Sequence, residues 1–221
     1  MNDYQKYIHL SKYSRFRDSL GRRETWEETV DRYTQFFKDY LRDKISDVDR
    51  INTTLQKVGE DIKCFKVAPS MRALMTAGPA LAREHACAYN CAAIAVDSPR
   101  VFDETFYLLL SGAGVGFSVE RQFINKLPTI ADELYPSDTV IVVHDSKLGW
   151  AKALKELIYL LYNGSIPKID YSKLRPAGAR LKTTGGRASG PQALELLCKR
   201  VIRIFQNAAG RKLNSLECPL S

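Results

Sequence analysis

A cysteine beside a group of glycines is the feature of this sequence that points most directly to chemistry. Cys91 opens a short, nearly continuous apolar run, and such a run predicts a buried β-strand. A second run, residues 115–119, follows Gly112, Gly114 and Gly116. Glycine has no Cβ atom, so a ligand can approach the backbone closely at these positions. The pattern predicts a small-molecule site beside a thiol, and a buried structural cysteine with a tight turn is the alternative.

A second stretch with chemical potential is the segment 175–191, in which basic residues alternate with glycines. Loops of this composition can hold phosphate groups, because backbone N–H groups and cationic side chains both attract an anion. The segment is not a Walker loop, since no Gly-Lys-Ser/Thr ends it. It predicts a phosphate site, and a solvated basic loop is the alternative. Its basic residues and glycines are Arg175, Gly178, Arg180, Lys182, Gly185, Gly186, Arg187 and Gly190.

The cysteine count favours reduced thiols over a disulfide framework, because the number is odd. The five cysteines are Cys64, Cys87, Cys91, Cys198 and Cys218. His85, Cys87 and Cys91 leave a metal site as an alternative. No second ligand pair follows at the spacing of zinc sites, so we predict no bound metal.

The composition is ordinary for a soluble globular protein, with 45% apolar and 26% charged residues. The formal net charge of +8 favours anionic partners, but it is spread along the chain and does not form a nucleic-acid tail. We find neither an apolar run long enough to span a bilayer nor the apolar core of a signal peptide. These observations predict a cytoplasmic protein with no membrane or nucleic-acid partner.

The elements that must position the thiol follow from apolar spacing. Residues 99–110 repeat their apolar side chains at helical spacing between the two predicted strands, so the three segments predict a βαβ unit and a parallel sheet. Further along, residues 139–144 predict a strand and 134–138 a loop. Amphipathic helices are expected over 146–162 and 192–209.

The first part of the chain predicts mainly helix. Residues 4–43 read as helical, with Gly21 in a connector, and a second helix is expected over 47–58, ended by Gly59. The aromatic stripe that includes Trp26 lies among basic residues. We expect it to face a core, and nucleic-acid binding is the alternative.

Three segments in order resemble the catalytic chain of ribonucleotide reductases. They are 69–75 (PSMRALM), 89–100 together with 112–121, and 174–191. The resemblance extends from Tyr4 to about Cys218. It is strongest to the adenosylcobalamin-dependent (class II) enzymes that act on ribonucleoside triphosphates.

The resemblance implies an α/β fold: a helical N-terminal region over residues 1–66, followed over 67–221 by about the first half of a ten-stranded α/β barrel. Residues 120–173 form a longer connection than dimeric ribonucleotide reductases have. This length resembles the monomeric class II enzymes, in which an insert takes the place of the dimer partner near the effector site.

The family reaction replaces the 2′-hydroxyl of a ribonucleotide by hydrogen through thiyl-radical chemistry, which supplies deoxyribonucleotides for DNA synthesis. Cys91 matches the first of two thiols that reduce the 2′ position, and Cys87 is not its partner in the family. Ser70, Asn90 and Gly114 match substrate-binding positions. Ser70 could equally serve as the cap of a helix.

The resemblance also implies a site for a deoxynucleotide effector that sets substrate choice. The matching positions are Asp97, Ser98, Arg175, Leu181, Lys182, Gly185 and Gly186. Further expected partners are adenosylcobalamin, bound outside this chain, and a thioredoxin-like reductant.

The second reducing thiol and the thiyl cysteine lie on later strands in the family and are absent from these 221 residues. We therefore expect an N-terminal fragment that is inactive by itself, with a second polypeptide as the partner that would complete the barrel. Pro219-Leu-Ser221 departs from the family pattern. Two alternatives stay open: the large chain of a metal-dependent dimeric reductase, and a non-catalytic basic α/β module that binds nucleic acid.

Overall fold

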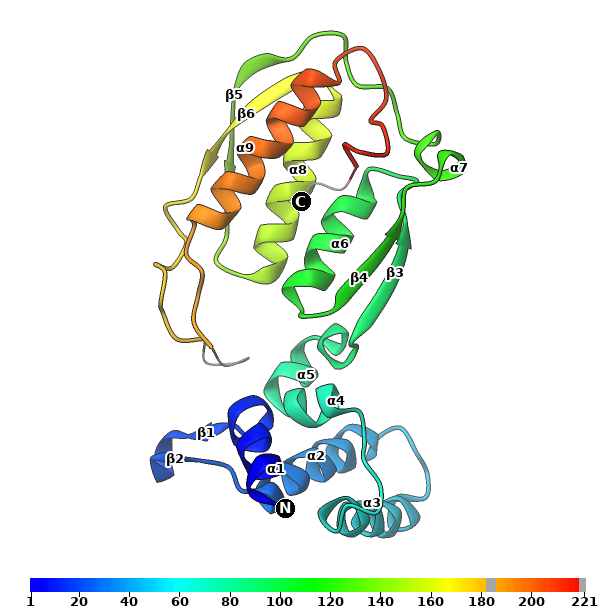
Figure 1. Cartoon of the computed structure of the whole chain (residues 1–221), viewed down its shortest axis with the longest axis vertical. Coiled ribbons are helices and arrows are strands. Elements are labelled where there is room, and N and C mark those ends of the chain that lie inside the picture. Colours follow the sequence, from blue (N-terminus) through cyan, green and yellow to red (C-terminus); the bar gives the residue numbers. More distant parts are fainter. Residues whose placement is uncertain (182–185, 219–221) are drawn as a thin grey trace. The chain divides into compact units, whose positions relative to one another are not determined.

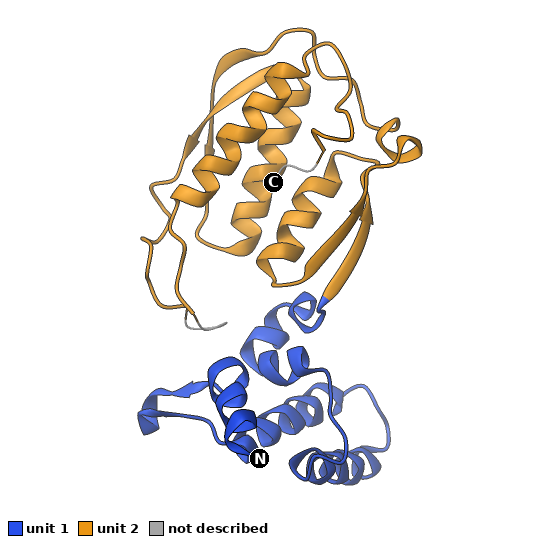
Figure 2. Cartoon of the chain, in the orientation of Figure 1, with its two compact units in different colours: residues 1–90, 183–185 blue, residues 91–182, 186–221 orange. Residues whose placement is uncertain are grey.

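The computed structural model describes residues 1–181 and 186–218 of the chain, and these form two compact units (Figure 2). In the described residues, unit 1 is Met1–Asn90 and unit 2 begins at Cys91. This division by compactness does not test the expected border at residue 66 between a helical region and a barrel, which stays a prediction. Lys182, Gly185 and the C-terminal residues 219–221 lie outside the described residues.

Unit 1 is mainly helical (Figure 1). Its helices are α1 (Asp3–Ile8), the π-helix η1 (His9–Tyr13), the 3₁₀ turn η2 (Asp18–Leu20), α2 (Trp26–Leu41), α3 (Val48–Lys63), α4 (Met71–Thr76), α5 (Pro79–Arg83) and the 3₁₀ turn η3 (His85–Ala88). Its strands are β1 (Phe16–Arg17) and β2 (Arg22–Arg23).

The prediction of helix over residues 4–43 is wrong between η1 and α2, apart from the expected connector at Gly21. Strands β1 and β2 pair there as a short antiparallel hairpin. Gly21 lies in the turn with φ +60, a left-handed conformation that glycine adopts without strain. Helix α2 then begins at a capping box of Thr25 and Glu28, and its predicted core stripe is confirmed at Trp26 and Val30, which are buried.

The predicted end of the second helix at Gly59 is wrong, since α3 continues to Lys63. Gly59 is buried where α3 packs against α2, and a Cβ atom there would lie 3.0 Å from Thr34 Cγ2. The glycine therefore permits close helix packing. The helix ends where Phe65 takes a left-handed conformation (φ +59) and stacks on Trp26, with ring centroids 5.0 Å apart.

Unit 2 contains two βαβ units and a further long helix, α9 (Figure 1). Helix α8 packs against both α6 and α9. The elements are β3 (Cys91–Ala95), α6 (Arg100–Leu110), β4 (Gly114–Ser118), α7 (Arg121–Ile124), β5 (Tyr135–Val142), α8 (Lys147–Tyr162), β6 (Ser165–Asp170) and α9 (Gln192–Asn207).

The predicted βαβ unit around the cysteine is confirmed. Strands β3 and β4 pair in parallel, with Cys91 opposite Gly114 and Ala95 opposite Ser118. Both strands enter at the same edge of the ladder, so the thiol and the glycine lie side by side.

The predicted loop over residues 134–138 is wrong, because β5 already begins at Tyr135. Its first residues pair in parallel with the start of β6, and the register shifts between Pro136 and Val140. Proline has no N–H group, so it is tolerated in a strand that pairs on one side only. The proline at this position is the reason why the sequence predicted a loop. The predicted helix over 146–162 is confirmed as α8, with Ser146 as its N-cap.

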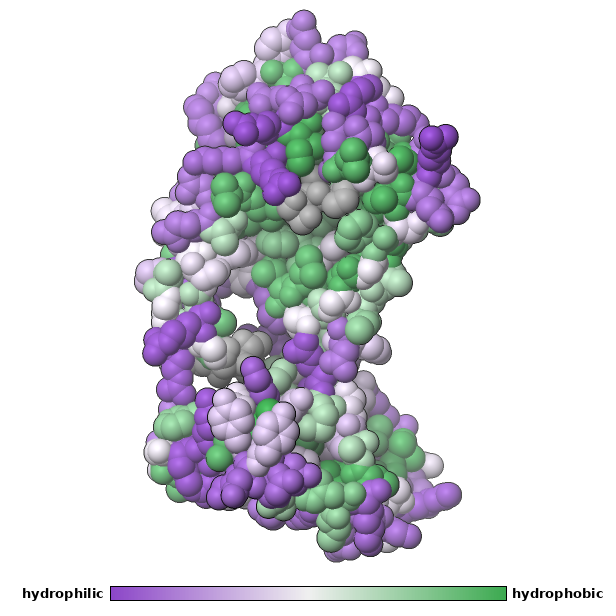
Figure 3. Space-filling view, viewed as in Figure 1, coloured by the Kyte–Doolittle hydropathy of each residue, from purple (hydrophilic) through white to green (hydrophobic). Residues whose placement is uncertain are grey.

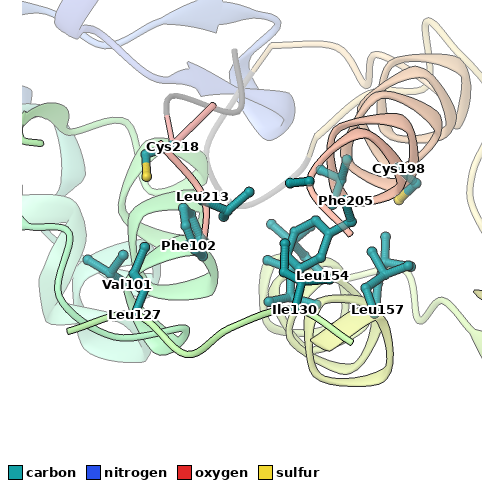
Figure 4. Packing of buried hydrophobic residues seen from close by; sticks show 14 of the residues in the cluster. Val101, Phe102, Leu127, Ile130, Leu154, Leu157, Cys198, Phe205, Leu213 and Cys218 are labelled. Atoms are coloured by element: carbon teal, nitrogen blue, oxygen red, sulfur yellow. The ribbon is translucent and has the colours of Figure 1, made fainter. Parts of the chain in front are cut away.

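The core of unit 2 lies between the helices and the strands. Phe205 of α9 and Leu157 of α8 are both fully buried. Figure 4 shows Phe205 beside Leu154 and Ile130, and Leu213 beside Phe102, all in the same cluster. The helix-facing residues Ile94 and Val96 belong to the same cluster, which fixes one face of the β3 segment against the helices.

The expected half-barrel is not visible in the structure. In the described residues each ladder has only two strands, β1–β2, β3–β4 and β5–β6. Parallel strands are normally covered on both faces and paired on both edges, and these ladders lack the neighbours that would complete such a sheet. What the structure establishes is a mixed α/β fold. None of the described helices is long and apolar enough to cross a membrane.

Candidate functional site

Cys91 lies exposed at the amino end of β3, directly opposite Gly114 in the ladder. The strand alternation sends Ile94 and Val96 to the core, so Cys91 and Ala93 face the opposite, open side. This position agrees with the prediction of an accessible thiol. The alternative, a buried structural cysteine, is contradicted.

The open side of the β3–β4 ladder carries only small residues near the thiol. Gly114 and Gly116 are exposed there, as is Ala93. A Cβ atom on Gly116 would meet only Ala92 O, at 3.9 Å, so neither steric crowding nor a left-handed backbone requires a glycine at this place. Glycine in a strand is a cost unless another group approaches closely.

The other two predicted substrate residues belong to unit 1. Asn90 precedes Cys91 in the chain and is exposed. Ser70 is the N-cap of α4, and its hydroxyl accepts a hydrogen bond from the backbone N–H of Ala73 (3.3 Å). The helix-cap interpretation of Ser70 is therefore confirmed. Its side chain is also exposed, so the cap leaves room for a ligand contact.

Asp97 and Ser98 lie at the opposite, carboxyl end of β3, between the strand and α6. The length of β3 separates Cys91 from Ala95 by about 13 Å, and Asp97 follows in a turn in which its N–H group donates to Ala95 O (3.0 Å). Lys126 Nζ lies 3.6 Å from the Asp97 carboxylate, and both groups are substantially exposed. A carboxylate at this edge can accept hydrogen bonds from sugar hydroxyl groups.

The basic, glycine-rich segment has the form of a hairpin stem. The N–H group of Gly178 donates to Ala188 O (2.8 Å), and the N–H group of Leu181 donates to Gly186 O (3.0 Å). Arg187 adds a hydrogen bond from its guanidinium to Gly178 O (2.9 Å). The stem brings Leu181 and Gly186 together.

Arg175, the predicted effector contact before this stem, is already paired. Its Nε donates to Asp145 Oδ2 at 2.7 Å, and both side chains are about one-third exposed. Sequence reasoning missed Asp145, which follows β5 and is distant in the chain. An effector at Arg175 would have to share or displace this carboxylate.

The remaining cysteines divide by burial. Cys64 is exposed, whereas Cys87, Cys198 and Cys218 are buried. Burial raises the pKa of Cys198, and burial together with the charge of Glu217 raises the pKa of Cys218 to about 11. No cluster of three or more His, Cys, Asp or Glu side chains that could hold a metal occurs in the described part of the chain.

Fold and site together define a mixed α/β protein that presents a thiol at a strand end, next to a glycine-lined ladder. No protein-family model matches the chain. It is 30% identical over 91% of its length to a protein of Mycobacterium phage D29 assigned to the adenosylcobalamin-dependent ribonucleoside-triphosphate reductases. The reductases of that name from Euglena gracilis and Lactobacillus leichmannii are 25% and 26% identical over 96% and 93% of the chain.

A crystal structure of a B12-dependent class II ribonucleotide reductase matches 96% of the chain with a TM-score of 0.85 and 22% identity. The match covers 38% of that structure, and the chain spans 33%, 31% and 36% of the three curated relatives. The chain is therefore a homologue of the adenosylcobalamin-dependent (class II) ribonucleotide reductases, and it corresponds to about the N-terminal third of the reductase chain.

Proposed function

We propose that the chain is the N-terminal part of a reductase that converts ribonucleoside triphosphates to 2′-deoxyribonucleoside triphosphates for DNA synthesis. The observation that carries the proposal is the exposed thiol of Cys91 directly opposite Gly114. This chain would contribute the first reducing thiol, part of the substrate pocket and the effector site.

The reduction balances with two thiols. Loss of the 2′-hydroxyl as water takes up two electrons and two protons, and two thiols supply both as they form a disulfide. Cys91 is one of them in this proposal. Its partner must bring its Cα atom within about 4.4–6.8 Å, so we place that second thiol on later residues of a complete reductase.

The outer edges of the two parallel ladders have no neighbouring strand in the described residues, which supports the expected barrel. A parallel sheet with exposed edges gains hydrogen bonds when further strands are added. Figure 3 shows hydrophobic residues on the face of unit 2 that carries α6 and α8, and Leu109 of α6 is half exposed. The remaining two-thirds of a reductase would cover such surfaces, whether it continues this chain or is a second polypeptide.

Adenosylcobalamin would supply the radical. An open cavity of about 760 Å³ in unit 1 does not fit it, because this cavity is lined mainly by charged residues, among them Arg15, Glu28 and Asp31. Large apolar ligand surfaces are normally held by apolar walls. In agreement with the resemblance, we propose that the cofactor is bound outside this chain.

For the effector we propose a deoxynucleoside triphosphate at the stem of the 175–191 loop. Arg175, Leu181 and Gly186 would contact the nucleotide there, together with Lys182 and Gly185, which are outside the described residues. Asp97 and Ser98 follow β3, whose carboxyl end lies near α7 on the other side of unit 2 (Figure 1), so we propose them as a separate contact to an effector sugar. The reductant would be a thioredoxin-like dithiol.

A reconstitution assay tests the proposed reaction. The purified chain is mixed with a polypeptide that carries the remaining two-thirds of the phage relative, adenosylcobalamin, a ribonucleoside triphosphate and a dithiol. We expect turnover with the wild-type chain and none with Cys91→Ser. Cys64→Ser removes the other exposed thiol and is the matched control, which should retain turnover.

Turnover by the Cys91→Ser variant would contradict the role of this thiol. Turnover by the chain without its complement would contradict the proposal that it is one part of the enzyme. In both experiments the measured quantity is the amount of deoxynucleotide formed per molecule of the chain.

The two alternatives make different predictions. The length of the 120–173 connection, which contains α8, favours the monomeric class II arrangement over a metal-dependent dimeric chain, as the resemblance implies. Turnover that needs no cobalamin would favour the dimeric class. Salt-dependent binding of DNA or RNA that displaces deoxynucleotides would favour the nucleic-acid module.

A further inference from the structure

Helix α4 ends in unit 1 with four backbone carbonyl groups that have no partner within the helix. Every helix leaves its last carbonyls unpaired, and buried ones need a donor from elsewhere. Leu74, Thr76 and Ala77 are all buried, so water cannot serve these groups freely.

Two arginines supply the donors for all four carbonyls. Arg32 Nη1 donates to Leu74 O (3.1 Å) and to Ala77 O (2.7 Å). Arg15 Nη2 donates to Met75 O (3.3 Å) and Thr76 O (2.9 Å). The rigid guanidinium fork makes such paired contacts possible, and two positive charges also complement the negative end of the helix dipole.

A buried carboxylate holds the two arginines in place. Glu24 accepts from Arg32 Nε (2.9 Å) and Nη2 (3.0 Å), and its side chain is 5% exposed. It also accepts from the backbone N–H of Arg15 (3.3 Å) and from the Thr29 hydroxyl (3.1 Å). Thr29 in turn contacts His9 Nε2 at 2.9 Å, so the network is connected through to η1.

A glycine immediately after α4, Gly78, leaves space for the guanidinium group of Arg15. Gly78 has φ +107, and a Cβ atom there would lie 3.2 Å from Arg15 Nη1. Burial and the charge of Arg32 lower the pKa of Arg15 to about 10, so the group stays protonated at neutral pH.

We infer that Arg15 and Arg32, oriented by Glu24, are positioning residues for the substrate pocket. They donate hydrogen bonds to the carboxyl end of α4. Because this helix is only about 9 Å long, the same bonds fix the position of Ser70 at its amino end. The inference rests on the proposed function for the role of Ser70. It gives a function to the charged residues around α2, which the sequence analysis left without one.

The test uses Arg32→Lys and Arg15→Lys in the full chain. Lysine keeps the charge but cannot serve two carbonyls with a planar fork. Arg22→Lys is the matched control, because Arg22 makes a bidentate pair with the partly exposed Glu28 (2.7 and 2.9 Å) and donates no hydrogen bond to an α4 carbonyl. Two quantities are measured: amide hydrogen exchange within residues 70–77, and the Kd of ATP, CTP, GTP and UTP, each alone.

In Arg15→Lys and in Arg32→Lys we expect faster hydrogen exchange at the amides of Leu74 and Ala77, and unchanged exchange in α3. We also expect triphosphate Kd to rise about tenfold, because small displacements of a positioning group weaken binding steeply. Arg22→Lys should change neither quantity. Unchanged exchange, or exchange that rises uniformly through unit 1, would overturn the inference, since the arginines would then merely stabilise the unit.

Faster local exchange with an unchanged Kd would also overturn it. A wild-type chain that binds no triphosphate would instead reject the proposed role of Ser70, and the inference with it. The two failures are distinguishable, because only the second is seen without any substitution.

Discussion

The five thiols occupy different environments, and their reactivity should follow. We expect iodoacetamide to modify Cys64 and Cys91 in the native chain, because both are exposed, and to spare Cys87, Cys198 and Cys218. Mass spectrometry of the alkylated peptides checks this, with unfolded chain as the control in which all five react. Protection of Cys91 in the folded chain would remove the basis for its proposed role.

His9 is a second residue with a testable environment. It is 3% exposed, and burial is the main cause that lowers its pKa, opposed by Glu24 and Glu27 and reinforced by Arg32. The folded chain therefore disfavours the protonated form, and the unfolded chain takes up the proton first. We expect the free energy of unfolding to fall as pH decreases below about 6.5.

Urea unfolding at several pH values measures this effect. His9→Gln should flatten the dependence below pH 6.5, whereas His85→Gln, at an exposed histidine of the same unit, should leave it unchanged. An unchanged slope in His9→Gln would show that other groups cause it.

At the scale of elements, the contact between α2 and α3 is tight enough to make a single methyl group matter. Gly59→Ala should lower the free energy of unfolding by about 1 kcal/mol, since overpacking against Thr34 Cγ2 outweighs the better helix propensity of alanine. Thr34→Ser removes that methyl group. Urea unfolding of both single variants and the double variant should show a favourable coupling of about 1 kcal/mol, and simple additivity would contradict the proposed clash.

The sequence predicted elements well where one period dominated a long stretch. The βαβ unit around Cys91 and the helices α8 and α9 follow from apolar spacing alone. The prediction failed where the usual preference of a single glycine or proline was overridden by packing or strand pairing. Gly59 suggests a helix end, but it permits close packing of α3 against α2. Pro136 suggests a loop, but it is the second residue of strand β5.

The candidate site was predictable only in part. The exposed position of Cys91 opposite Gly114 follows from the strand pattern. The partners Asp145 and Lys126 do not, because the sequence does not say which distant charges meet. The sequence did contain a signal for Glu24 and Arg32: both are charged residues close to the buried stripe of the amphipathic helix that begins at Trp26. Only the buried carbonyls of α4 show what they serve.

At the scale of the whole molecule, the open ladders should govern behaviour in solution. We expect the 221-residue chain, produced alone, to self-associate as its concentration rises, because exposed strand edges pair with other chains. Phe117 and Val140, on β4 and β5, are 50% and 53% exposed. Phe117→Lys with Val140→Lys should reduce association in sedimentation velocity.

Leu20→Lys is the matched control for this change. Leu20 is 52% exposed and lies in unit 1, whose described strands form no parallel ladder. If it suppresses association as strongly as the double substitution, general surface hydrophobicity is the cause and not the strand edges.

Strand β3 also constrains how the family can change over time. Cys91 begins it and Asp97 follows its end, while alternate side chains between them turn to the helices. An insertion or deletion of one residue within β3 would rotate the thiol to the helix side and leave the carboxylate in place. We expect descendants that retain both groups to accept substitutions in this strand but no change of its length, whereas the surrounding loops can lengthen or shorten freely.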